Sequence, residues 1–336
     1  MINIGITGQA GFIGTHLYNY LNLLKDEVHL VPFEDRFFSG KTDLESFVSK
    51  CDAIVHLAAL NRHNDPQTIY DTNIGLVKQL ISALENTGSR PHILFSSSTQ
   101  EERDNVFGKS KREGRQLLSL WAERNGAPFT GMVIPNVFGP FGNPYYNSVV
   151  ATFSHQLTHD GQPIVEVDAQ LKLIYIGDLV KVIWHLIKNR VSDGEYKISP
   201  TDEAKVTEIL TLLQSFKDQY TENGIVPDLS DPFERNLFNT FVCYIDHAKF
   251  FPYKLRINTD ERGSFVETVK LHSGGQISFS TTKPGVTRGN HFHTRKAERF
   301  AVIKGKAQIQ LRRIGTDSII NLELDGAEPA FVDMPV

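Results

Sequence analysis

The chain has 336 residues, of which 40% are hydrophobic, enough to form more than one well-buried core. Its formal net charge is −4 and it has no basic run, which argues against nucleic acid as the main partner. We find no signal peptide, no apolar stretch of membrane-spanning length and only Cys51 and Cys243, so we expect a cytoplasmic protein without disulfides.

The N-terminal segment is an apolar strand that runs directly into a glycine-rich turn. Glycines at this spacing permit a tight turn and close approach of a pyrophosphate to the backbone. Apolar residues then recur at helical spacing up to Leu24, and the first N–H groups of such a helix can bind phosphate. This context predicts a dinucleotide-binding turn. Its predicted cofactor-binding residues are Gly8, Gly11, Phe12, Ile13 and Gly14.

From residue 2 to about residue 190, strands and helices alternate, which predicts a parallel sheet covered by helices on both faces. The predicted strands span residues 2–6, 28–31, 53–57, 92–95, 130–134 and 171–176. Helical periodicity is clearest at 77–84 and 179–186, and it returns at 206–216. We therefore predict an α/β Rossmann fold, with a doubly wound parallel sheet, over residues 1–246.

The choice of cofactor depends on the end of the second strand, where Glu34 and Asp35 precede Arg36. An acidic residue there favours the free ribose hydroxyl of NAD, whereas an arginine accommodates the 2′-phosphate of NADP. The three charges can also be solvated loop residues. We expect NADP(H), with Arg36 as its contact, and NAD stays the alternative.

Motifs farther along this half resemble a known family. Ser98 ends the fourth strand, and Phe107 precedes Lys111 by four residues, so positions 107 and 111 share one face of a predicted helix. The other matching segments are the glycine turn, residues 56–59, Asn73 and residues 135–140. In order and spacing, residues 1–245 resemble the extended short-chain dehydrogenase/reductase family.

This resemblance implies roles for single residues. In that family a serine and a tyrosine polarise the substrate carbonyl, and a lysine four residues after the tyrosine holds the nicotinamide ribose. Ser98 and Lys111 match, whereas the tyrosine position is Phe107, which offers no proton. The further positions implied are cofactor contacts at Leu57, Ala58 and Asn73 and substrate contacts at Asn136, Asn147 and Ser148.

Phe107 leaves two explanations open. Either the substitution silences the reductase, or water or Ser98 supplies the proton instead. Losing a general acid typically costs roughly 10²- to 10⁴-fold in rate. We keep the reductase prediction and expect a slow reaction.

After about residue 247 the sequence changes to short β segments separated by glycine turns. His291 and His293 alternate along one predicted strand, so both project to the same face, and Glu298 follows shortly after. These residues can form a three-ligand pocket for a divalent metal, and we predict metal ligands at all three positions. An exposed His-x-His on a surface strand is the alternative.

The spacing from Gly285 through these ligands to Gly305 resembles the first cupin motif, and residues 260–267 resemble a strand of sugar-nucleotide 3,5-epimerases of that superfamily. The resemblance implies a zinc-binding cupin domain, a jelly-roll β-barrel, over residues 247–336. The second cupin motif is absent from the sequence. We therefore expect a barrel that is incomplete at its C-terminal end.

A reductase of this type followed by a cupin resembles the CapF/WbjC group of bifunctional capsular-polysaccharide enzymes. The resemblance implies a homodimer that acts on a UDP-linked 2-acetamido-2,6-dideoxy-4-keto-hexose. The cupin half would epimerise carbon 3, and the Rossmann half would reduce the carbon 4 ketone with NADPH, giving an L-FucNAc-type sugar for capsule or O-antigen. Two other interpretations stay open: a metal-free epimerase with His291 as the base, and an NADP(H)-binding sensor or scaffold without turnover.

Overall fold

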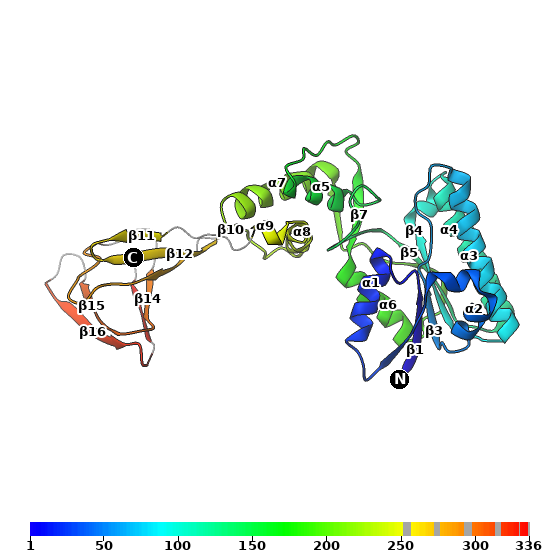
Figure 1. Cartoon of the computed structure of the whole chain (residues 1–336), viewed down its shortest axis with the longest axis horizontal. Coiled ribbons are helices and arrows are strands. Elements are labelled where there is room, and N and C mark those ends of the chain that lie inside the picture. The colour runs from blue at the N-terminus through cyan, green and yellow to red at the C-terminus, as the bar shows by residue number, and fades with distance from the viewer. Residues whose placement is uncertain (251–256, 272–275, 292–297, 313–316, 329, 335–336) are drawn as a thin grey trace. The chain divides into compact units, whose positions relative to one another are not determined.

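The computed structural model describes residues 1–250, 257–271, 276–291, 298–312, 317–328 and 330–334 (Figure 1). Contacts between Cα atoms divide the chain into two compact units, Met1–Lys254 with Thr268–Ile277 and Leu255–Glu267 with Ser278–Val336. The boundary expected from the sequence, at 246/247, lies slightly earlier in the chain. Within the ranges given above, no helix is both long enough and apolar enough to cross a membrane.

The first unit is built on a six-stranded parallel sheet with the strand order β2-β1-β3-β4-β5-β8 (Figure 1). Its strands are β1 (Ile2–Thr7), β2 (Val28–Val31), β3 (Ala53–His56), β4 (His92–Ser98), β5 (Phe129–Ile134) and β8 (Asp193–Lys197). The strands β3, β4 and β5 are buried along almost their whole length, which explains their apolar sequences. Because β2 and β3 pair with opposite sides of β1, the carboxyl ends of β1 and β3 form the switch point where ligands bind in open α/β sheets.

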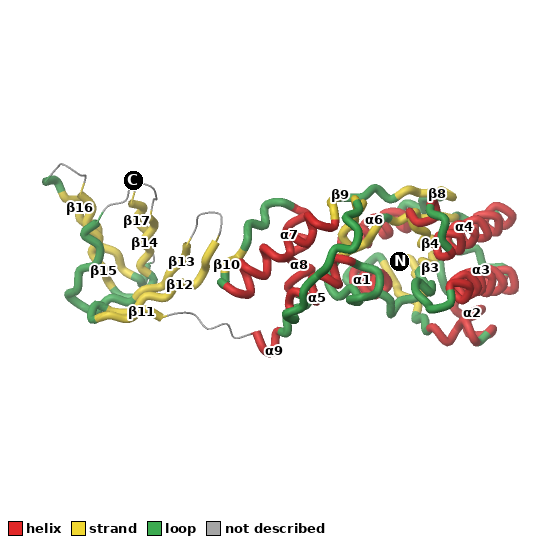
Figure 2. The backbone as a smooth tube through the Cα atoms, turned by 90° about the horizontal axis from the view of Figure 1, so that it is seen from above, coloured by secondary structure: helices red, strands yellow, loops and turns green. Residues whose placement is uncertain are grey.

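Helices cover both faces of this sheet, as the alternation of elements predicts. One face carries α1 (Phe12–Asn22) and α6 (Ile176–Lys188), and the other carries α2 (Lys41–Val48), α3 (Pro66–Thr87) and α4 (Val106–Asn125) (Figures 1 and 2). The first layer buries Leu17 and Ile183 against the sheet, and the second buries Leu80 and Trp121. The predicted doubly wound Rossmann architecture is confirmed for this unit.

One predicted strand lies outside the central sheet. Residues 171–176 correspond to β7 (Gln170–Tyr175), which pairs with β6 (Asn136–Phe138) and β9 (Asp202–Lys205) in a separate three-stranded sheet. The sixth strand of the central sheet is β8, whose sequence Asp-Gly-Glu-Tyr-Lys contains no apolar run. An edge strand pairs on one side only and keeps much of its surface in water, so it gives no clear hydrophobic signal.

A helical layer next to β6, β7 and β9 completes the first unit. Its elements are α5 (Val149–Thr158), α7 (Val206–Phe216), a π-helical turn (Lys217–Glu222), β10 (Ile225–Val226), α8 (Pro232–Val242) and α9 (His247–Phe250). Their apolar sides enclose a core of their own, which includes Phe138, Phe153, Phe216 and Phe241. This core supports the loop that joins β6 to α5.

The C-terminal part consists of short strands that pair mainly antiparallel. They are β11 (Ile257–Asp260), β12 (Gly263–Leu271), β13 (Gln276–Ser280), β14 (Glu298–Val302), β15 (Lys306–Arg312), β16 (Ile319–Asp325) and β17 (Ala330–Met334). β12 pairs with β11 and β13, β14 with β17 and β15 with β16, while the end of β12 runs parallel to β10 within the first unit. The predicted β character is confirmed. These pairings, taken over the residues that can be described, do not form a closed barrel.

Candidate active site

The glycine turn between β1 and α1 leaves no room for side chains. Gly8 has a φ of +69°, and a Cβ there would lie 2.7 Å from the backbone nitrogen of Ala58. A Cβ on Gly14 would lie 2.3 Å from the carbonyl oxygen of Gly8. The Gly11 N–H donates to that same oxygen at 3.0 Å and closes the turn. The backbone is therefore open to a phosphate at the N-terminus of α1.

The carboxyl ends of β1 and β3 are joined behind this turn. Thr7 Oγ1 lies 2.7 Å from His56 Nδ1 and accepts a hydrogen bond from the Ala58 N–H at 3.4 Å. Burial lowers the pKa of His56 to about 3, so its ring is neutral at pH 7. Leu57 and Ala58, two of the predicted cofactor contacts, accordingly lie at the switch point of the sheet.

A cavity of about 400 Å³ opens beside the glycine turn and the end of β2. Its lining consists of Gln9, Ala10, Thr15, Tyr18, Phe33, Glu34 and Asp35. Arg36 is not part of the lining, because its Nε and Nη2 donate to the Glu34 carboxylate at 2.7 and 3.2 Å and its side chain is 71% exposed. Phe12 and Ile13 form the first turn of α1 and are half-buried.

Lys111 is a buried ammonium at the end of β4. Its side chain comes from α4, and Nζ donates to the Ser96 carbonyl oxygen at 2.9 Å. The centroids of the Phe95 and Phe107 rings lie 5.2 and 5.6 Å from this nitrogen, within the range of cation–π attraction. Burial lowers the pKa of Lys111 to about 8, while the Glu101 carboxylate acts to raise it. This lysine therefore changes its charge close to neutral pH.

Ser98 and Phe107 lie at the same edge of the sheet. Ser98 ends β4 and caps the 3₁₀ turn η2 (Thr99–Glu102), where its Oγ accepts from the Gln100 N–H at 3.2 Å. This leaves the hydroxyl hydrogen of Ser98 for a different acceptor. Phe107 is half-buried in the first turn of α4 and has no group that can exchange a proton. The structure thus places Ser98, Phe107 and Lys111, which the sequence predicts to be catalytic, at the carboxyl end of β4 and in the first two turns of α4.

Asn73 holds a loop in position. Its side chain is buried, Oδ1 accepts from the Leu60 N–H at 2.7 Å, and Nδ2 donates to the Leu60 carbonyl at 3.1 Å. Nδ2 also donates to Ser110 Oγ at 3.0 Å, on the helix that carries Lys111. The amide group is therefore engaged in fixing the loop after β3 against α4. Its predicted contact to the cofactor stays a prediction.

The three predicted substrate residues lie around β6 and the start of α5. Asn136 begins β6, and its Nδ2 donates to the Lys172 carbonyl at 3.1 Å. Ser148 is the N-cap of α5, where its Oγ accepts from the Ala151 N–H at 3.3 Å. Asn147 precedes it and is exposed. Two of these side chains therefore support local structure, and Asn147 faces solvent.

The loop between β6 and α5 contains two aromatic residues with left-handed backbone. Phe141 and Tyr145 have φ values of 62° and 59°, which are uncommon for bulky side chains. The Tyr145 N–H donates to Thr152 Oγ1 at 2.9 Å, and its carbonyl accepts from Arg62 Nη1 at 2.5 Å. Arg62 follows β3, so it links the cofactor side of the site to this loop. Sequence analysis did not identify this link, because Arg62 and Tyr145 are 83 positions apart and belong to no common motif.

The predicted metal ligands lie only partly on described residues. His291 lies outside any strand, and its Nε2 is 4.0 Å from Glu298 Oε2 at the start of β14. The strand prediction for His291 is wrong because Gly289 and Asn290, directly before it, have φ values of 96° and 58°. His293 lies outside the described residues. Elsewhere in the ranges that are described, no group of three His, Cys, Asp or Glu side chains could hold a metal, so zinc is not supported.

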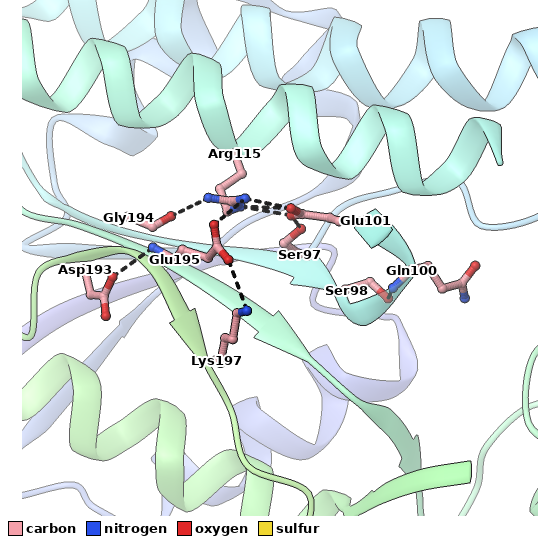
Figure 3. Close-up of polar contacts among 9 residues, drawn as sticks. All are labelled: Ser97, Ser98, Gln100, Glu101, Arg115, Asp193, Gly194, Glu195 and Lys197. Atoms are coloured by element: carbon pink, nitrogen blue, oxygen red, sulfur yellow. Dashed lines mark hydrogen bonds and ion pairs between the residues drawn. The ribbon is translucent and has the colours of Figure 1, made fainter. Parts of the chain in front are cut away.

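A buried ion pair that sequence analysis did not identify involves the short turn that begins at Ser98 (Figure 3). Arg115 donates from Nε to Glu101 Oε1 at 2.9 Å and from Nη2 to Glu101 Oε2 at 2.7 Å. Glu101 is 6% exposed and also accepts from Ser97 Oγ. Arg115 follows Lys111 by four residues, which places both on one face of α4.

The sheet order and the glycine turn define a protein of the nucleotide-binding Rossmann class. Residues 4–199 match the model of the NAD dependent epimerase/dehydratase family, and the chain belongs to this family. Residues 258–336 match the polysaccharide biosynthesis C-terminal domain. Proteins with the family's fold bind nicotinamide cofactors at the glycine turn described above.

Two relatives are similar over nearly the whole chain. The UDP-2-acetamido-2,6-beta-L-arabino-hexul-4-ose reductase of Pseudomonas aeruginosa is 32% identical over 98% of this chain and 87% of that protein. The crystal structure of the capsular polysaccharide assembling protein CapF from Staphylococcus aureus superposes with a TM-score of 0.85 at 33% identity, covering 100% of this chain and 90% of that chain. The predicted resemblance to the CapF/WbjC group is confirmed.

A second solved structure shares the fold alone. RMD from Pseudomonas aeruginosa, solved in complex with NADPH, superposes with a TM-score of 0.58 at 21% identity. The match covers 65% of this chain and 83% of that chain.

Proposed function

We propose that the first unit reduces the carbon 4 ketone of a UDP-linked 2-acetamido-2,6-dideoxy-4-keto-hexose with NADPH. The observation that carries this proposal is the buried Lys111 ammonium, which donates to the carbonyl oxygen of Ser96, two residues before Ser98 on β4. The substrate class comes from the Pseudomonas reductase, which is similar over 98% of this chain.

The residues at the switch point fit a nicotinamide dinucleotide. Gly8, Gly11 and Gly14 leave the space that a pyrophosphate requires, and the N-terminus of α1 supplies N–H donors. Lys111 would hold the ribose next to the nicotinamide. When bound, the cofactor supplies the hydride. The fit to a pyrophosphate rests on the space at the glycine turn, which a single Cβ on Gly8 or Gly14 would fill.

For the nucleotide end we propose NADP(H), with Arg36 turning from Glu34 toward the 2′-phosphate. The exposed guanidinium supports this choice, because few contacts hold it in place. Glu34 and Asp35 line the cavity and support NAD, which stays the alternative.

Ser98 and Lys111 have different tasks in this reaction. The Ser98 hydroxyl donates a hydrogen bond to the substrate carbonyl oxygen, on which negative charge develops. The Lys111 ammonium adds positive potential at the same edge of the sheet. Phe107 supplies no proton, so we propose that the proton comes from Ser98, directly or through a water, and that reduction is slow.

We further propose that the C-terminal part, folded as a cupin-type barrel, epimerises carbon 3 of the same sugar before the reduction. A ketone at carbon 4 acidifies the neighbouring carbon 3 proton. A base can remove this proton, and reprotonation from the opposite face inverts the centre. His291 is the proposed base, because its exposed ring lies 4.0 Å from the Glu298 carboxylate, which can stabilise the imidazolium. No step of this proposal passes through a metal.

A sensor or scaffold that binds NADP(H) without turnover is the alternative, and Phe107 is the residue that favours it. The serine–lysine pair argues for turnover. The domain limits 1–246 and 247–336, the homodimer and the cytoplasmic location stay predictions from the sequence.

The test is incubation with UDP-linked 4-keto-6-deoxy amino sugars in D₂O. We expect NMR to show deuterium entering carbon 3 and absorbance at 340 nm to show NADPH consumption. Lys111→Met should stop the consumption and leave the deuterium uptake. Tight NADPH binding with neither reaction, across all such sugars, would establish the sensor instead.

A further inference from the structure

Glu101 and Arg115 join three elements at the end of β4 (Figure 3). Arg115 reaches from α4 to Glu101 in η2 with two short hydrogen bonds, at 2.9 and 2.7 Å. Its Nη1 also donates to the Gly194 carbonyl at 2.9 Å, and its Nη2 to the Glu195 carboxylate at 3.2 Å, both on β8. The Glu101 and Arg115 side chains are only 8% and 12% exposed. A forked arginine–carboxylate pair in this setting is strong and directional.

The strand β5 has a glycine, Gly131, where the Arg115 side chain crosses it toward β8. On β5, a Cβ added to Gly131 would lie 2.6 Å from Arg115 Cδ and 2.4 Å from the Gly194 carbonyl oxygen. Gly131 has no unusual φ, so the space alone accounts for the glycine. The ion pair therefore depends on residues of η2, α4 and β5 together.

The pair holds the turn that carries Ser98. Glu101 accepts a hydrogen bond from Ser97 Oγ, and Ser98 caps the same turn by accepting from the Gln100 N–H at 3.2 Å. On the other side, the Gln100 carbonyl approaches α4 so closely that a Cβ on Gly108 would lie 2.0 Å from it. The turn η2 is thus clamped between β4 and α4, and Ser98 sits at its start.

Glu101 also acts on the charge of Lys111. Burial lowers the Lys111 pKa to about 8, and the Glu101 carboxylate opposes this effect. His56 on β3 also interacts with the lysine, but burial keeps its ring neutral at pH 7. Arg115, one turn further along α4, is paired with Glu101 and Glu195. Glu101 is therefore the anion that opposes the burial of this ammonium.

We propose that Glu101 and Arg115 are positioning residues of the reductase site, which hold Ser98 in place and keep Lys111 protonated at neutral pH. The roles of Glu101 and Arg115 in catalysis rest on the proposed reduction. The effect of Glu101 on the protonation of Lys111 can be measured in the cofactor-free protein, so this effect and the proposed reduction can fail separately.

The first test is Glu101→Gln in the full chain. The amide keeps an oxygen that accepts from Ser97 and removes the negative charge. Arg115 then keeps only Glu195 as an anionic partner. We expect the Lys111 titration, followed by ¹³Cε NMR in the cofactor-free protein, to move to lower pH by about one unit. The loss of NADPH affinity at high pH should move with it. Glu27→Gln, which removes the exposed ion pair to Lys188, is the matched control and should change neither.

The second test is Arg115→Lys, which keeps the positive charge and loses the fork. We expect kcat to fall at least tenfold with little change in the KM for the sugar, because Ser98 is displaced while the Lys111 titration stays near its original pH. A folded Glu101→Gln protein with a lowered unfolding temperature and an unchanged Lys111 titration would overturn the proposal, since the pair would then be structural only. If wild type consumes no NADPH with any UDP-linked 4-keto sugar, the reduction is wrong, and the Lys111 titration still decides the role of Glu101.

Discussion

The Lys111 nitrogen lies 5.6 Å from the centroid of the Phe107 ring, one helical turn earlier on α4. A hydroxyl on that ring would come under the positive field of the ammonium, which lowers the pKa of a phenol. The chain keeps the lysine and lacks the phenol. The phenol is thus the component of the site that this sequence leaves out.

The substitution Phe107→Tyr should raise the rate of ketone reduction by roughly 10²- to 10⁴-fold, which is what a well-placed general acid contributes. NADPH affinity should hardly change, because Lys111 and the glycine turn are untouched. Stopped-flow absorbance at 340 nm measures the rate, and Phe107→Leu is the control that removes the ring without adding a donor. A wild-type protein that already turns over as fast as Phe107→Tyr would show that a different group donates the proton.

Gly8→Ala should abolish cofactor binding, because the new Cβ would lie 2.7 Å from the Ala58 nitrogen at a residue with a φ of +69°. Gly75→Ala is the matched control: it lies within α3, where a Cβ meets nothing within 4 Å. There the substitution should leave binding intact and stabilise the fold by about 0.5–1 kcal/mol. Calorimetric titration with NADPH and thermal unfolding report the two effects. Full affinity in a folded Gly8→Ala protein would contradict the assignment of the pyrophosphate to this turn.

The two proposed activities use different residues and should separate by mutation. His291→Ala should stop deuterium uptake at carbon 3 and leave NADPH affinity unchanged, while Lys111→Ala should do the reverse. NMR in D₂O and fluorescence titration with NADPH measure the two properties on the same samples. If either substitution removed both activities in a folded protein, the assignment of the reactions to separate sites would be wrong.

The first unit should lose stability in acid partly through His92. This histidine is buried, its Nε2 lies 2.8 Å from Thr130 Oγ1, and burial lowers its pKa from 6.5 to about 4. The folded state therefore binds a proton less readily than the unfolded state. Stability is complete above about pH 6.5 and falls as the pH drops toward 4, by roughly 2 kcal/mol at pH 5.

Replacing the ring by His92→Gln should flatten this part of the pH dependence. Urea unfolding between pH 7 and pH 4.5 gives the slope, and the remaining slope reports other groups such as His56, whose pKa of about 3 acts in the same direction. An identical slope in wild type and His92→Gln would assign the acid sensitivity to other residues.

The parts of the fold that depend on burial could be predicted from the sequence. The strands β1, β3, β4 and β5 are largely buried, so their apolar runs mark their positions in the sequence. The glycine turn could be predicted because its glycines have no space for a Cβ. The strand β8 could not be predicted this way. It is polar, and it belongs to the sheet only because its backbone pairs with β5.

The catalytic candidates could be predicted from a sequence motif. The residues that fix their positions could not. Glu101 and Arg115 are 14 positions apart and meet only because η2 and α4 pack together. Similarly, Arg62 reaches the carbonyl of Tyr145 across 83 positions. The left-handed backbone of Gly289 and Asn290, two residue types that adopt it readily, removes His291 from the strand that the His-x-His pattern suggests.

In the sequence, β8 follows β7 and α6, and this order decides where a stable fragment of the protein can end. A fragment that ended with α6, where the simple alternation of strands and helices stops, would lack the strand that covers the outer edge of β5. The unpaired N–H and C=O groups of residues 130–133 would then be exposed beside a hydrophobic surface, a combination that promotes aggregation. Arg115 would also lose its contact to Gly194. An independently expressed reductase half should therefore extend beyond Ile245, the last buried residue of the adjoining helical core.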